Sequence, residues 1–367
     1  MTEPDPRQLV QLCPKRLCEY LSRVFVAAGA NESEALAIAE NLVDANLAGH
    51  DSHGVVRVPR YLRDERRKHV KFGQSVEMVI DGGAFTLLEG RFGFGQVLGR
   101  QSVEIGISKA SEHGVALVAL RNAGHLGRIG EWAEQAADAG YISIHFVNVA
   151  RSMLVAPFGA AERRMSTAPV TIGIANGTDD HFILDFATSR IAEGKALIAL
   201  QGGPKPPFGG LVDSKGLPTD DPQVLYGPVA EGEVPNPRAG PGALVAMGDH
   251  KGSGLAIACE LLAGALTGSG TTGPGEGPYN GMFSIYIDPA VIDDGHGAAA
   301  SISNYIDFVR QARPADGVDS VMVPGDPERR ARHLRQHRLP LPSDTWQRLI
   351  EAGDYYGVQA PASVTGP

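Results

Sequence analysis

The spacing of apolar residues changes twice along this chain, and this change restricts the fold more than any single motif does. One stripe near the amino terminus follows the i, i+3, i+4, i+7 rule of an amphipathic helix, and it consists of Leu17, Tyr20, Leu21, Val24 and Phe25. Asn31, with Glu34 three residues later, predicts the start of a second helix. Pro59 suits the first turn of a third.

After residue 72 the pattern becomes mixed. Short apolar runs predict strands at residues 76–80, 85–88, 115–120, 141–148, 182–186 and 283–287. The 115–120 run is continuously apolar and predicts a buried strand. Helices are expected at 97–113, 131–139, 189–200 and 253–267, and again at 327–337 and 343–352. Residues 160–180 indicate turns and short strands, and residues 201–242, rich in Pro and Gly, predict a long ordered loop region.

With 367 residues, the chain is too long for one ordinary core, so we expect two domains. Because helical patterns lie at both ends, the simplest arrangement is a helical domain built from both termini around a central α/β domain. The boundaries predicted are 1–72 for the first helical part, 73–295 for the cofactor-binding α/β domain and 296–367 for the second helical part.

The composition excludes several classes of function. The net charge is −9, and the one basic run, residues 57–71, is interrupted by Asp64 and Glu65, so we expect a solvated helix face and no nucleic-acid partner. The first seven residues lack the apolar core of a signal peptide. The apolar stretch at 254–266 is short and carries Glu260, which predicts a buried helix and no membrane contact. Three scattered cysteines indicate a reducing compartment, so we expect a cytoplasmic protein.

A dinucleotide-binding fingerprint is not supported by its context. Residues 268–273 match G-x-G-x-x-G, but they follow a predicted helix and lead into a loop, whereas the fingerprint needs a strand before it and a helix after it. The glycines at 93, 95 and 99 have a better context and the wrong spacing. Any nicotinamide cofactor would therefore bind without a Rossmann signature.

The segment from His50 to Gly54 is the first candidate site. An imidazole is the usual proton carrier near neutral pH, and Ser52 or Asp51 beside His53 could set its tautomer. Arg57 offers a planar fork that holds a carboxylate with two bonds. The same pattern also fits a polar helix terminus capped by Ser52, or a metal site using His50 and His53.

The glycine loop from Gly124 to Gly130 is the second candidate. It follows a predicted buried strand and precedes a helix, which is where active-site loops of α/β proteins lie. Gly124, Gly127 and Gly130 permit close approach of backbone to a ligand, and amides at the helix start can hold an anion. His125 is thus a second candidate acid or base, and its alternative is a turn histidine.

Three further segments are weak when taken singly. Asp185 ends a predicted strand, and Thr188 and Ser189 behind it could simply cap a helix. Lys251 lies in a glycine loop at a predicted helix start, where charge and exposed amides could bind a phosphate. The sequence Pro324-Gly325-Asp326 by itself is a turn.

In combination, these segments resemble the malate/L-lactate dehydrogenase family of the non-Rossmann type, which includes ureidoglycolate, sulfolactate and diketogulonate oxidoreductases and cyclic-imine reductases. The resemblance runs from about residue 15 to residue 350 and rests on Ser52-His53-Gly54 with Arg57 and Tyr61, Gly124-His125-Leu126-Gly127, Ala168-Pro169, residues 184–189 with Gly194-Lys195, residues 213–221, residues 251–255 with Glu260, and Pro324-Gly325-Asp326. Asp249-His250 and Ala168 depart from the family pattern.

The resemblance implies an α+β fold in which the helical domain packs on a larger domain with a mixed, largely antiparallel sheet, not a Rossmann fold. It implies NAD or NADP as cofactor, a homodimer and no metal. His53, His125, Ser52 and Asp185 take the catalytic positions, and Arg57 and Tyr61 take the substrate-binding positions. The implied cofactor-binding residues are Gly124, Leu126, Gly127, Phe186, Ala187, Thr188, Lys251, Gly252, Pro324, Gly325 and Asp326.

The function expected is an NAD(P)H-dependent oxidoreductase that transfers a hydride between the cofactor and C2 of a small 2-oxo or 2-hydroxy acid, malate- or lactate-like, or of a cyclic imino acid. Either His53 or His125 would supply the proton, and Arg57 would hold the carboxylate. One alternative is a metal-dependent hydrolase or lyase that uses His50, Asp51, His53 and His125. Another is a family member that binds nucleotide or a partner without turnover.

Overall fold

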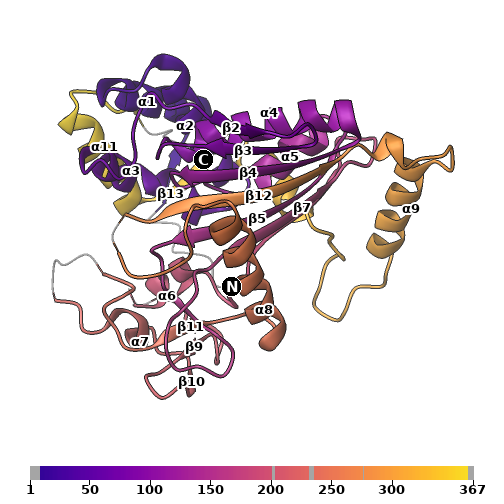
Figure 1. Cartoon of the computed structure of the whole chain (residues 1–367). Helices are drawn as coiled ribbons and strands as arrows, with labels where there is room; N and C mark the ends of the chain where they lie inside the picture. Colours follow the sequence, from indigo (N-terminus) through magenta and orange to yellow (C-terminus); the bar gives the residue numbers. More distant parts are fainter. Residues whose placement is uncertain (1–8, 201–202, 231–234, 276, 363–367) are drawn as a thin grey trace.

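A seven-stranded sheet runs through the centre of the computed structural model, which describes residues 9–200, 203–230, 235–275 and 277–362 (Figure 1). Its strands, in spatial order, are β2 (Glu77–Asp81), β3 (Phe85–Glu89), β4 (Val115–Ala123), β12 (Tyr279–Ile287), β5 (Ile142–Ala150), β7 (Pro169–Ile174) and β8 (Phe182–Ala187). All neighbours run antiparallel except β3 and β4. The expected mixed, largely antiparallel sheet is confirmed.

Helices α4 (Gly95–His113) and α5 (Gly130–Asp138) cover one face of this sheet (Figure 1). Strand side chains alternate between faces, and those on the helix side form a buried core with Trp132 of α5. In β4, Val118 and Leu120 belong to this core. This layer brings the end of β4 and the start of α5 together, with the predicted glycine loop between them.

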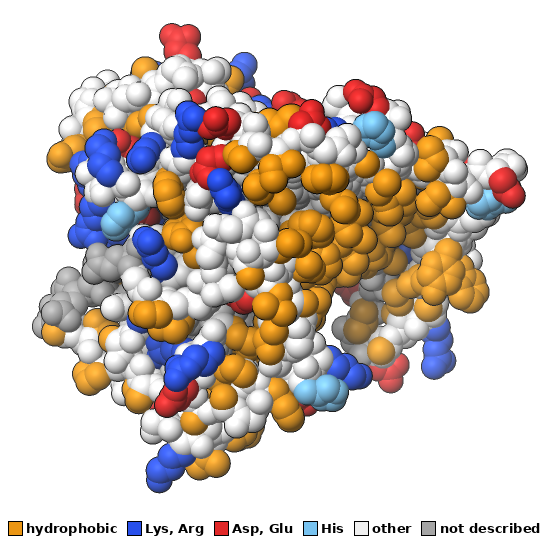
Figure 2. All heavy atoms as spheres, viewed as in Figure 1, with side chains coloured by type: hydrophobic (Ala, Val, Ile, Leu, Met, Phe, Trp, Pro, Cys, Tyr) orange, Lys and Arg blue, Asp and Glu red, His pale blue; other side chains and the backbone are white. Residues whose placement is uncertain are grey.

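The opposite face of the sheet is apolar; α8 (His250–Cys259) and the π-helix that follows it cover part of it by packing on β5, β12 and β7, and the rest is open. Val115 and Leu117 of β4 are 42% and 39% exposed, so the prediction of a fully buried strand at 115–120 was wrong for one of its two faces. The strand register places apolar side chains across five strands in one row, which consists of Phe85, Leu117, Ile285, Ile144 and Ile172. Figure 2 shows hydrophobic side chains gathered over this part of the molecule.

The two ends of the chain share one helical core, as the apolar spacing predicted. It contains α1 (Pro14–Ala27), α2 (Glu32–Leu47), α3 (Val58–Arg66) and α11 (Ser343–Tyr355), and β1 (Leu9–Leu12) pairs with β13 (Leu339–Pro342). The Tyr20 hydroxyl donates to the Leu349 carbonyl over 2.7 Å. Asn31 caps α2 by accepting from the Glu34 amide, and the Glu34 carboxylate accepts from the Gly73 amide.

The C-terminal part is less uniform than expected. Helix α9 (Ala298–Arg310) was not predicted and lies at the far end of the sheet from α11 (Figure 1). Helix α10 (Asp326–Arg335) runs along α2. The proposed division at residues 72 and 296 remains a prediction.

The region predicted as one long loop contains regular structure. In its described part, β9 (Leu211–Val212) and β10 (Pro218–Thr219) form a small sheet with β11 (Ala243–Val245) and β6 (Val155–Ala156), and the short helix α7 (Gln223–Tyr226) contacts β9 and β11. Residues 201–202 and 231–234 lie outside the described residues. Helix α6 (Glu193–Leu200) begins four residues later than predicted.

The most apolar helix is only partly buried. Helix α8 (His250–Cys259) continues as a π-helix, η4 (Glu260–Leu266). Cys259 and Ala263 are fully buried, whereas Leu261 and Leu266 are 57% and 64% exposed, so the expectation of a buried helix holds for one side only. Within the described ranges, no helix has both the length and the apolar character needed to cross a membrane.

Candidate active site

The structure brings the two predicted imidazoles together from separate segments. His53 ends the short 3₁₀ helix η2 (Asp51–His53), and His125 lies in the loop between β4 and α5. Their rings are stacked, with centroids 5.7 Å apart and planes inclined by 9°. Arg57 follows in η3 (Val55–Arg57), and its Nε donates to the Ser52 carbonyl over 2.6 Å. Two histidines and a guanidinium therefore form one cluster.

His53 is half-buried and has one side-chain partner. Its Nδ1 lies 3.2 Å from Ser52 Oγ, a hydroxyl that can donate or accept. Burial, and then the charges of Arg57 and His50, lower the pKa of His53 to about 3. The unliganded protein therefore holds this imidazole neutral at pH 7.

His125 is held by a phenol. Its Nδ1 lies 2.6 Å from Tyr61 Oη, and Gln96 Nε2 donates to the same oxygen over 2.9 Å. Burial raises the pKa of Tyr61 to about 12, so the phenol keeps its proton. Burial, and then the charges of Arg57 and His53, hold the pKa of His125 well below its usual range. This second imidazole is also neutral without a ligand.

The loop that carries His125 is fixed by buried hydrogen bonds. Leu126 donates its amide to Asn280 Oδ1 over 2.9 Å and accepts from Trp132 Nε1 at its carbonyl over 3.1 Å. Gly95, at the start of α4, lies so close that a Cβ there would collide with the His125 carbonyl oxygen. Glycine at 95 thus permits a backbone approach that holds the loop in place.

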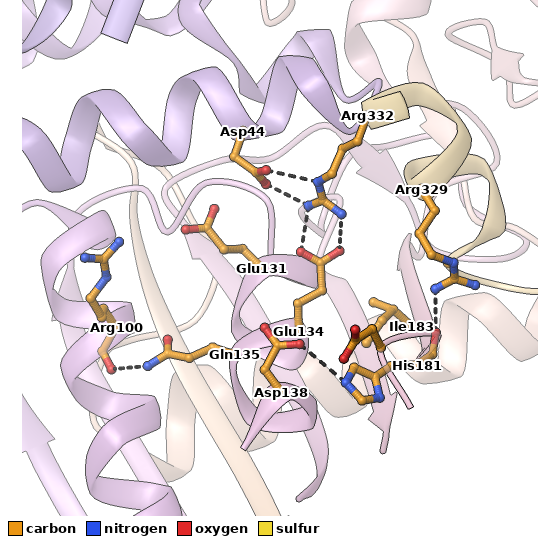
Figure 3. A pocket seen from close by; sticks show the side chains of 12 residues that line it. Asp44, Arg100, Glu131, Glu134, Gln135, Asp138, His181, Ile183, Arg329 and Arg332 are labelled. Atoms are coloured by element: carbon orange, nitrogen blue, oxygen red, sulfur yellow. Dashed lines mark hydrogen bonds and ion pairs between the residues drawn. The ribbon is translucent and has the colours of Figure 1, made fainter. Parts of the chain in front are cut away.

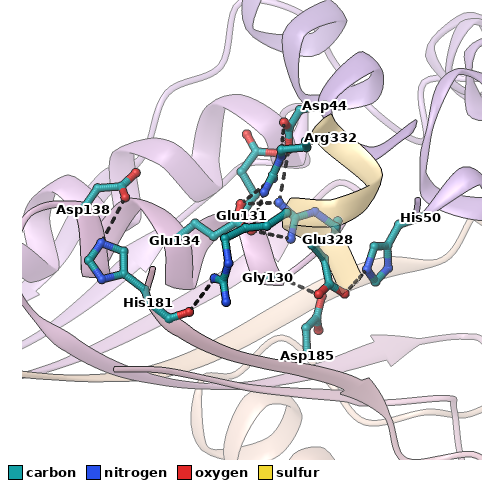
Figure 4. Close-up of polar contacts among 12 residues, drawn as sticks. Asp44, His50, Gly130, Glu131, Glu134, Asp138, His181, Asp185, Glu328 and Arg332 are labelled. Carbon is teal, nitrogen blue, oxygen red and sulfur yellow. Dashed lines mark hydrogen bonds and ion pairs between the residues drawn. The ribbon is translucent and has the colours of Figure 1, made fainter. Parts of the chain in front are cut away.

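The turn that carries His53 is held partly by charge. Asn46 of α2 accepts from the Val55 amide over 2.8 Å and donates to the Asp51 carboxylate over 2.6 Å. His50 Nε2 lies 2.9 Å from a carboxylate oxygen of Glu328 in α10 (Figure 4). Arg335 of the same helix pairs with Asp51 over 2.8 Å. Helix α10 therefore holds the turn that carries His53 in place.

Asp185, in β8, points its carboxylate at the start of α5. Its carboxylate accepts from the Gly130 amide over 2.8 Å (Figure 4) and from Thr171 Oγ1 over 2.7 Å. In the part of the chain that the structure describes, no hydrogen bond joins Asp185 to either imidazole. Its predicted role in orienting the histidines stays a prediction.

The predicted cofactor-binding residues are spread over several elements. Phe186 and Ala187 end β8, and Thr188 donates its hydroxyl to the Ala168 carbonyl over 2.9 Å, so it does not cap α6. Lys251 is exposed in the first turn of α8, and its neighbour Gly252 is buried.

The third predicted cofactor segment opens α10. Gly325 has a φ of +100°, which glycine adopts readily, and Pro324 accepts from the Ile183 amide over 3.2 Å. Asp326 accepts from Arg310 and from Arg329, and these hydrogen bonds outweigh burial and lower the pKa of its carboxyl group.

A polar cavity of about 510 Å³ opens beside α5 and α10 (Figure 3). Its lining residues are Asp44, Arg100, Glu131, Glu134, Gln135, Asp138, Asp179, His181, Ile183, Gly325, Arg329 and Arg332. Of the predicted site residues only Gly325 is among them, and neither imidazole is. Arg332 bridges Asp44 and Glu134 (Figure 3), and buried Arg128 contacts the same two carboxylates. His181 Nδ1 is buried and has no partner among the described residues.

The four residues of the metal-site alternative do not form one ligand set. His50 contacts Glu328, and Asp51 contacts Asn46 and Arg335. Among the described residues, the cluster with ligand spacing is instead Asp293, Asp294 and His296, in the turn before α9. Asp293 there accepts backbone amides, which accounts for the turn without a metal.

Sequence reasoning missed Gln96, Asn280 and Asn46, three buried amides that hold the two histidine segments. Gln96 had a signal, because it directly follows the glycine pair at 93 and 95. Asn280 had none, because it lies 154 residues from the Leu126 amide that it holds. Asn46 lies only nine residues from the Val55 amide, but a polar residue inside a helix does not show which loop amide it accepts from.

The chain is similar to known proteins along most of its length. A family model described as malate/L-lactate dehydrogenase matches residues 13–350. Hydroxycarboxylate dehydrogenase B of Escherichia coli (strain K12) is 37% identical over 350 residues, or 93% of each chain. A Δ(1)-pyrroline-2-carboxylate/Δ(1)-piperideine-2-carboxylate reductase of Pseudomonas syringae pv. tomato is 33% identical over 347 residues, 92% of this chain and 94% of the relative. The structure of sulfolactate dehydrogenase from Methanocaldococcus jannaschii is similar, with a TM-score of 0.83 and 31% identity over 95% of this chain and 98% of that one.

Proposed function

Because the chain belongs to the malate/L-lactate dehydrogenase family, we propose that it interconverts a small 2-oxo acid or cyclic imino acid with its 2-hydroxy or 2-amino form at the His53–His125 cluster. The family is one of NAD(P)-dependent oxidoreductases acting on 2-hydroxy acids or cyclic imines. The observation that carries the proposal is the stacked imidazole pair beside Arg57, since a 2-oxo acid needs a proton donor at its C2 oxygen and a cation for its carboxylate.

Substrate binding and protonation are coupled in this proposal. The charge of Arg57 helps to hold the pKa values of both imidazoles low in the unliganded protein. A substrate carboxylate bound by Arg57 compensates that charge and raises the pKa of the nearby histidine. The acid would therefore bind together with the proton that the reduction consumes, and the reverse reaction would begin from a neutral imidazole ready to act as a base.

The cavity next to α10 suits one half of a dinucleotide. Arg100 suits a phosphate group, whereas Arg329 and Arg332 are already paired with carboxylates, and carboxylates such as Asp179 are usual partners of ribose hydroxyls. The unpartnered His181 Nδ1 also lacks the bond that a ligand could supply. These residues and the Gly325 turn would hold NAD or NADP, which supplies or accepts the hydride when bound.

The relatives define the panel for a direct test. Hydroxycarboxylates, sulfolactate and cyclic imino acids are named for three of them, and all carry a carboxylate beside C2. Purified protein should oxidise NADH or NADPH, followed at 340 nm, with at least one 2-oxo acid or cyclic imine of this panel, and EDTA should not change the rate. No oxidation with either cofactor and any panel member would overturn the proposal. Hydrolysis abolished by EDTA would favour the metal-dependent alternative.

We propose a second copy of this chain as the partner of the open sheet face. The open part of that face carries one apolar row across five strands, and Leu117, the second residue of the row, is 39% exposed. Leu117→Glu should convert a dimer into a monomer in light scattering coupled to size-exclusion chromatography, whereas Glu162→Gln at an exposed site should not. A wild-type monomer, or an unchanged Leu117→Glu dimer, would refute this interface.

A further inference from the structure

The amide of Gln96 has a defined orientation. Its Nε2 donates to Tyr61 Oη over 2.9 Å and lies 3.3 Å from the His125 carbonyl oxygen. The reverse orientation would place the amide oxygen against that carbonyl, where two acceptors repel each other. Gln96 is 1% exposed, and its Oε1 has no partner among the described residues. Leaving a buried acceptor unpaired is unfavourable, so the hydrogen bonds that Gln96 contributes here are those of its nitrogen.

The hydroxyl proton of Tyr61 then has one acceptor among the described residues. Tyr61 Oη accepts from Gln96, and in the described ranges its remaining partner is His125 Nδ1 at 2.6 Å. The phenol therefore donates to Nδ1, and the single proton of neutral His125 lies on Nε2, at the other edge of the ring. No described protein group bonds Nε2, so this N–H is available to a ligand.

His53 differs in this respect. Its one side-chain partner, Ser52 Oγ at 3.2 Å, can donate to Nδ1 or accept from it. The Ser52 hydroxyl can therefore follow a change of protonation at His53, whereas the Gln96–Tyr61 pair resists one at His125. A group that gains and loses a proton in every turnover needs a partner that can both donate and accept, as the Ser52 hydroxyl can.

We propose that Gln96, acting through Tyr61, locks His125 as a permanent Nε2–H donor to the C2 oxygen or nitrogen of the substrate, and that His53 is the group that transfers the proton. This inference rests on the proposed function. It makes Gln96 and Tyr61 positioning residues and divides the work between the two histidines.

The step balances without a further reactant. In the reduction, C2 would receive the hydride that bound NADH or NADPH would supply, and the C=O π pair would move to oxygen. That oxygen takes a proton from the His53 imidazolium, which becomes neutral and regains its proton from solvent. His125 keeps its Nε2 proton and stabilises the oxygen charge as it develops.

The first test reads the tautomer itself. In ¹⁵N-histidine-labelled protein without ligand, the resonances of His125, assigned with His125→Gln, should show a protonated Nε2 and an unprotonated Nδ1. In Tyr61→Phe this preference should weaken. A proton on Nδ1 in the wild-type protein would overturn the inference. Because the measurement needs no turnover, an inactive protein with the expected tautomer would refute the proposed function and leave the relay intact.

The second test reverses the relay. In Gln96→Glu an ionised carboxylate would accept from Tyr61, so that Tyr61 would accept from Nδ1–H and Nε2 would face the substrate without a proton. We expect kcat to fall about 100-fold, as when one donor to a developing oxyanion is lost, with KM within about threefold. Activity should recover as the pH falls and the new carboxyl group becomes a donor, because a neutral carboxyl restores a donor in place of the amide.

Gln101→Glu in the same helix is the matched control, because Gln101 Oε1 accepts from the Val76 amide and a carboxylate can do the same. It should keep wild-type kcat and pH profile. Wild-type kcat in Gln96→Glu across the pH range would overturn the inference. If Gln96→Glu does not fold, the tautomer measurement on the wild-type protein still decides.

Discussion

The two histidine segments of this enzyme are held by different kinds of interaction. The loop with His125 is fixed by buried amide, indole and phenol hydrogen bonds from Asn280, Trp132 and Tyr61. The turn with His53 is fixed by Asn46 and by two side-chain pairs with α10, the hydrogen bond between His50 and Glu328 and the ion pair between Asp51 and Arg335. One segment is thus anchored in the core of the sheet layer, and the other is braced from outside by a helix from the far end of the chain.

This difference suits two roles. Neutral buried hydrogen bonds specify one geometry, and breaking them leaves unpaired groups in a medium of low polarity. Partly exposed ion pairs are weaker and respond to salt and pH. A fixed donor is best held by neutral buried hydrogen bonds. A group that exchanges a proton with solvent is better held by partly exposed pairs. The division of work between His125 and His53 therefore has a counterpart in the scaffold.

The largest expected effect separates the two histidines directly. His53→Gln should lower kcat by about 10²- to 10⁴-fold, because a positioned acid or base is lost. His125→Gln keeps a side-chain N–H and should lower kcat less, with the pH dependence of the wild-type enzyme retained. Single-turnover rates at several pH values would measure both. Equal losses together with equal changes of pH profile would break the comparison.

The sequence predicted what depends on local pattern. The helices α1 and α2 were evident from apolar spacing and a capping residue, and the histidine segments from residue types that carry proton chemistry. It also predicted that the chain ends share a core, since both are amphipathic helices with no other partner of their kind.

The sequence did not predict what depends on the packing of distant segments. Continuous apolar character at residues 115–120 was taken as burial, but Leu117 faces outward, because periodicity does not say whether a face is covered within the chain. Asn280 contacts a backbone amide 154 residues away, so no local pattern marks it. The strands β9 and β10 have two residues each, which is too short for periodicity to reveal.

Two buried asparagines test the supports themselves. Asn280→Ala removes the acceptor for the Leu126 amide, and Asn46→Ala removes the acceptor for the Val55 amide. Each should lower the free energy of unfolding by about 1–3 kcal/mol, since a buried donor loses its partner. Urea denaturation at low and high salt would measure both.

The two variants should differ in kinetics, with added salt aggravating the loss of kcat for Asn46→Ala alone. The same salt response in both would show that the two supports are alike.

Arg57 acts on both histidines, because its charge lowers the pKa of each imidazole. Arg57→Lys keeps the charge and loses the planar fork, so we expect KM for the acid to rise about tenfold, with a smaller change in kcat. Steady-state kinetics over a wide range of substrate concentration would measure this. Arg60→Lys, which disturbs a partly exposed pair with Asp64, serves as the control. An unchanged KM in Arg57→Lys would remove Arg57 from the carboxylate-binding role.

The smallest expected effects are changes of stability with pH, and they have opposite signs on the His125 side and on the His53 side. On the His125 side, burial and then Asp44 raise the pKa of Glu131 to about 7. A raised carboxyl pKa contributes stability at low pH that is lost as the pH rises towards 7. On the His53 side, burial alone would raise the pKa of Glu328, but the His50 hydrogen bond, a backbone hydrogen bond and the charges of His50 and Arg128 together outweigh burial and lower the pKa. That contribution is present near neutral pH and is lost in acid.

Glu131→Gln should therefore stabilise the protein at pH 8 by about 1 kcal/mol and change little at pH 4.5. Its new side chain still accepts from Asn41, which donates to Glu131 over 2.6 Å. Glu328→Gln should destabilise by a similar amount at pH 8, with a smaller difference at pH 4.5. Urea denaturation of both variants and the wild type at the two pH values gives the four differences. If Glu131→Gln lost stability at pH 8, its charged carboxylate would be part of the support, and the contrast between a neutral and a charged scaffold would fail.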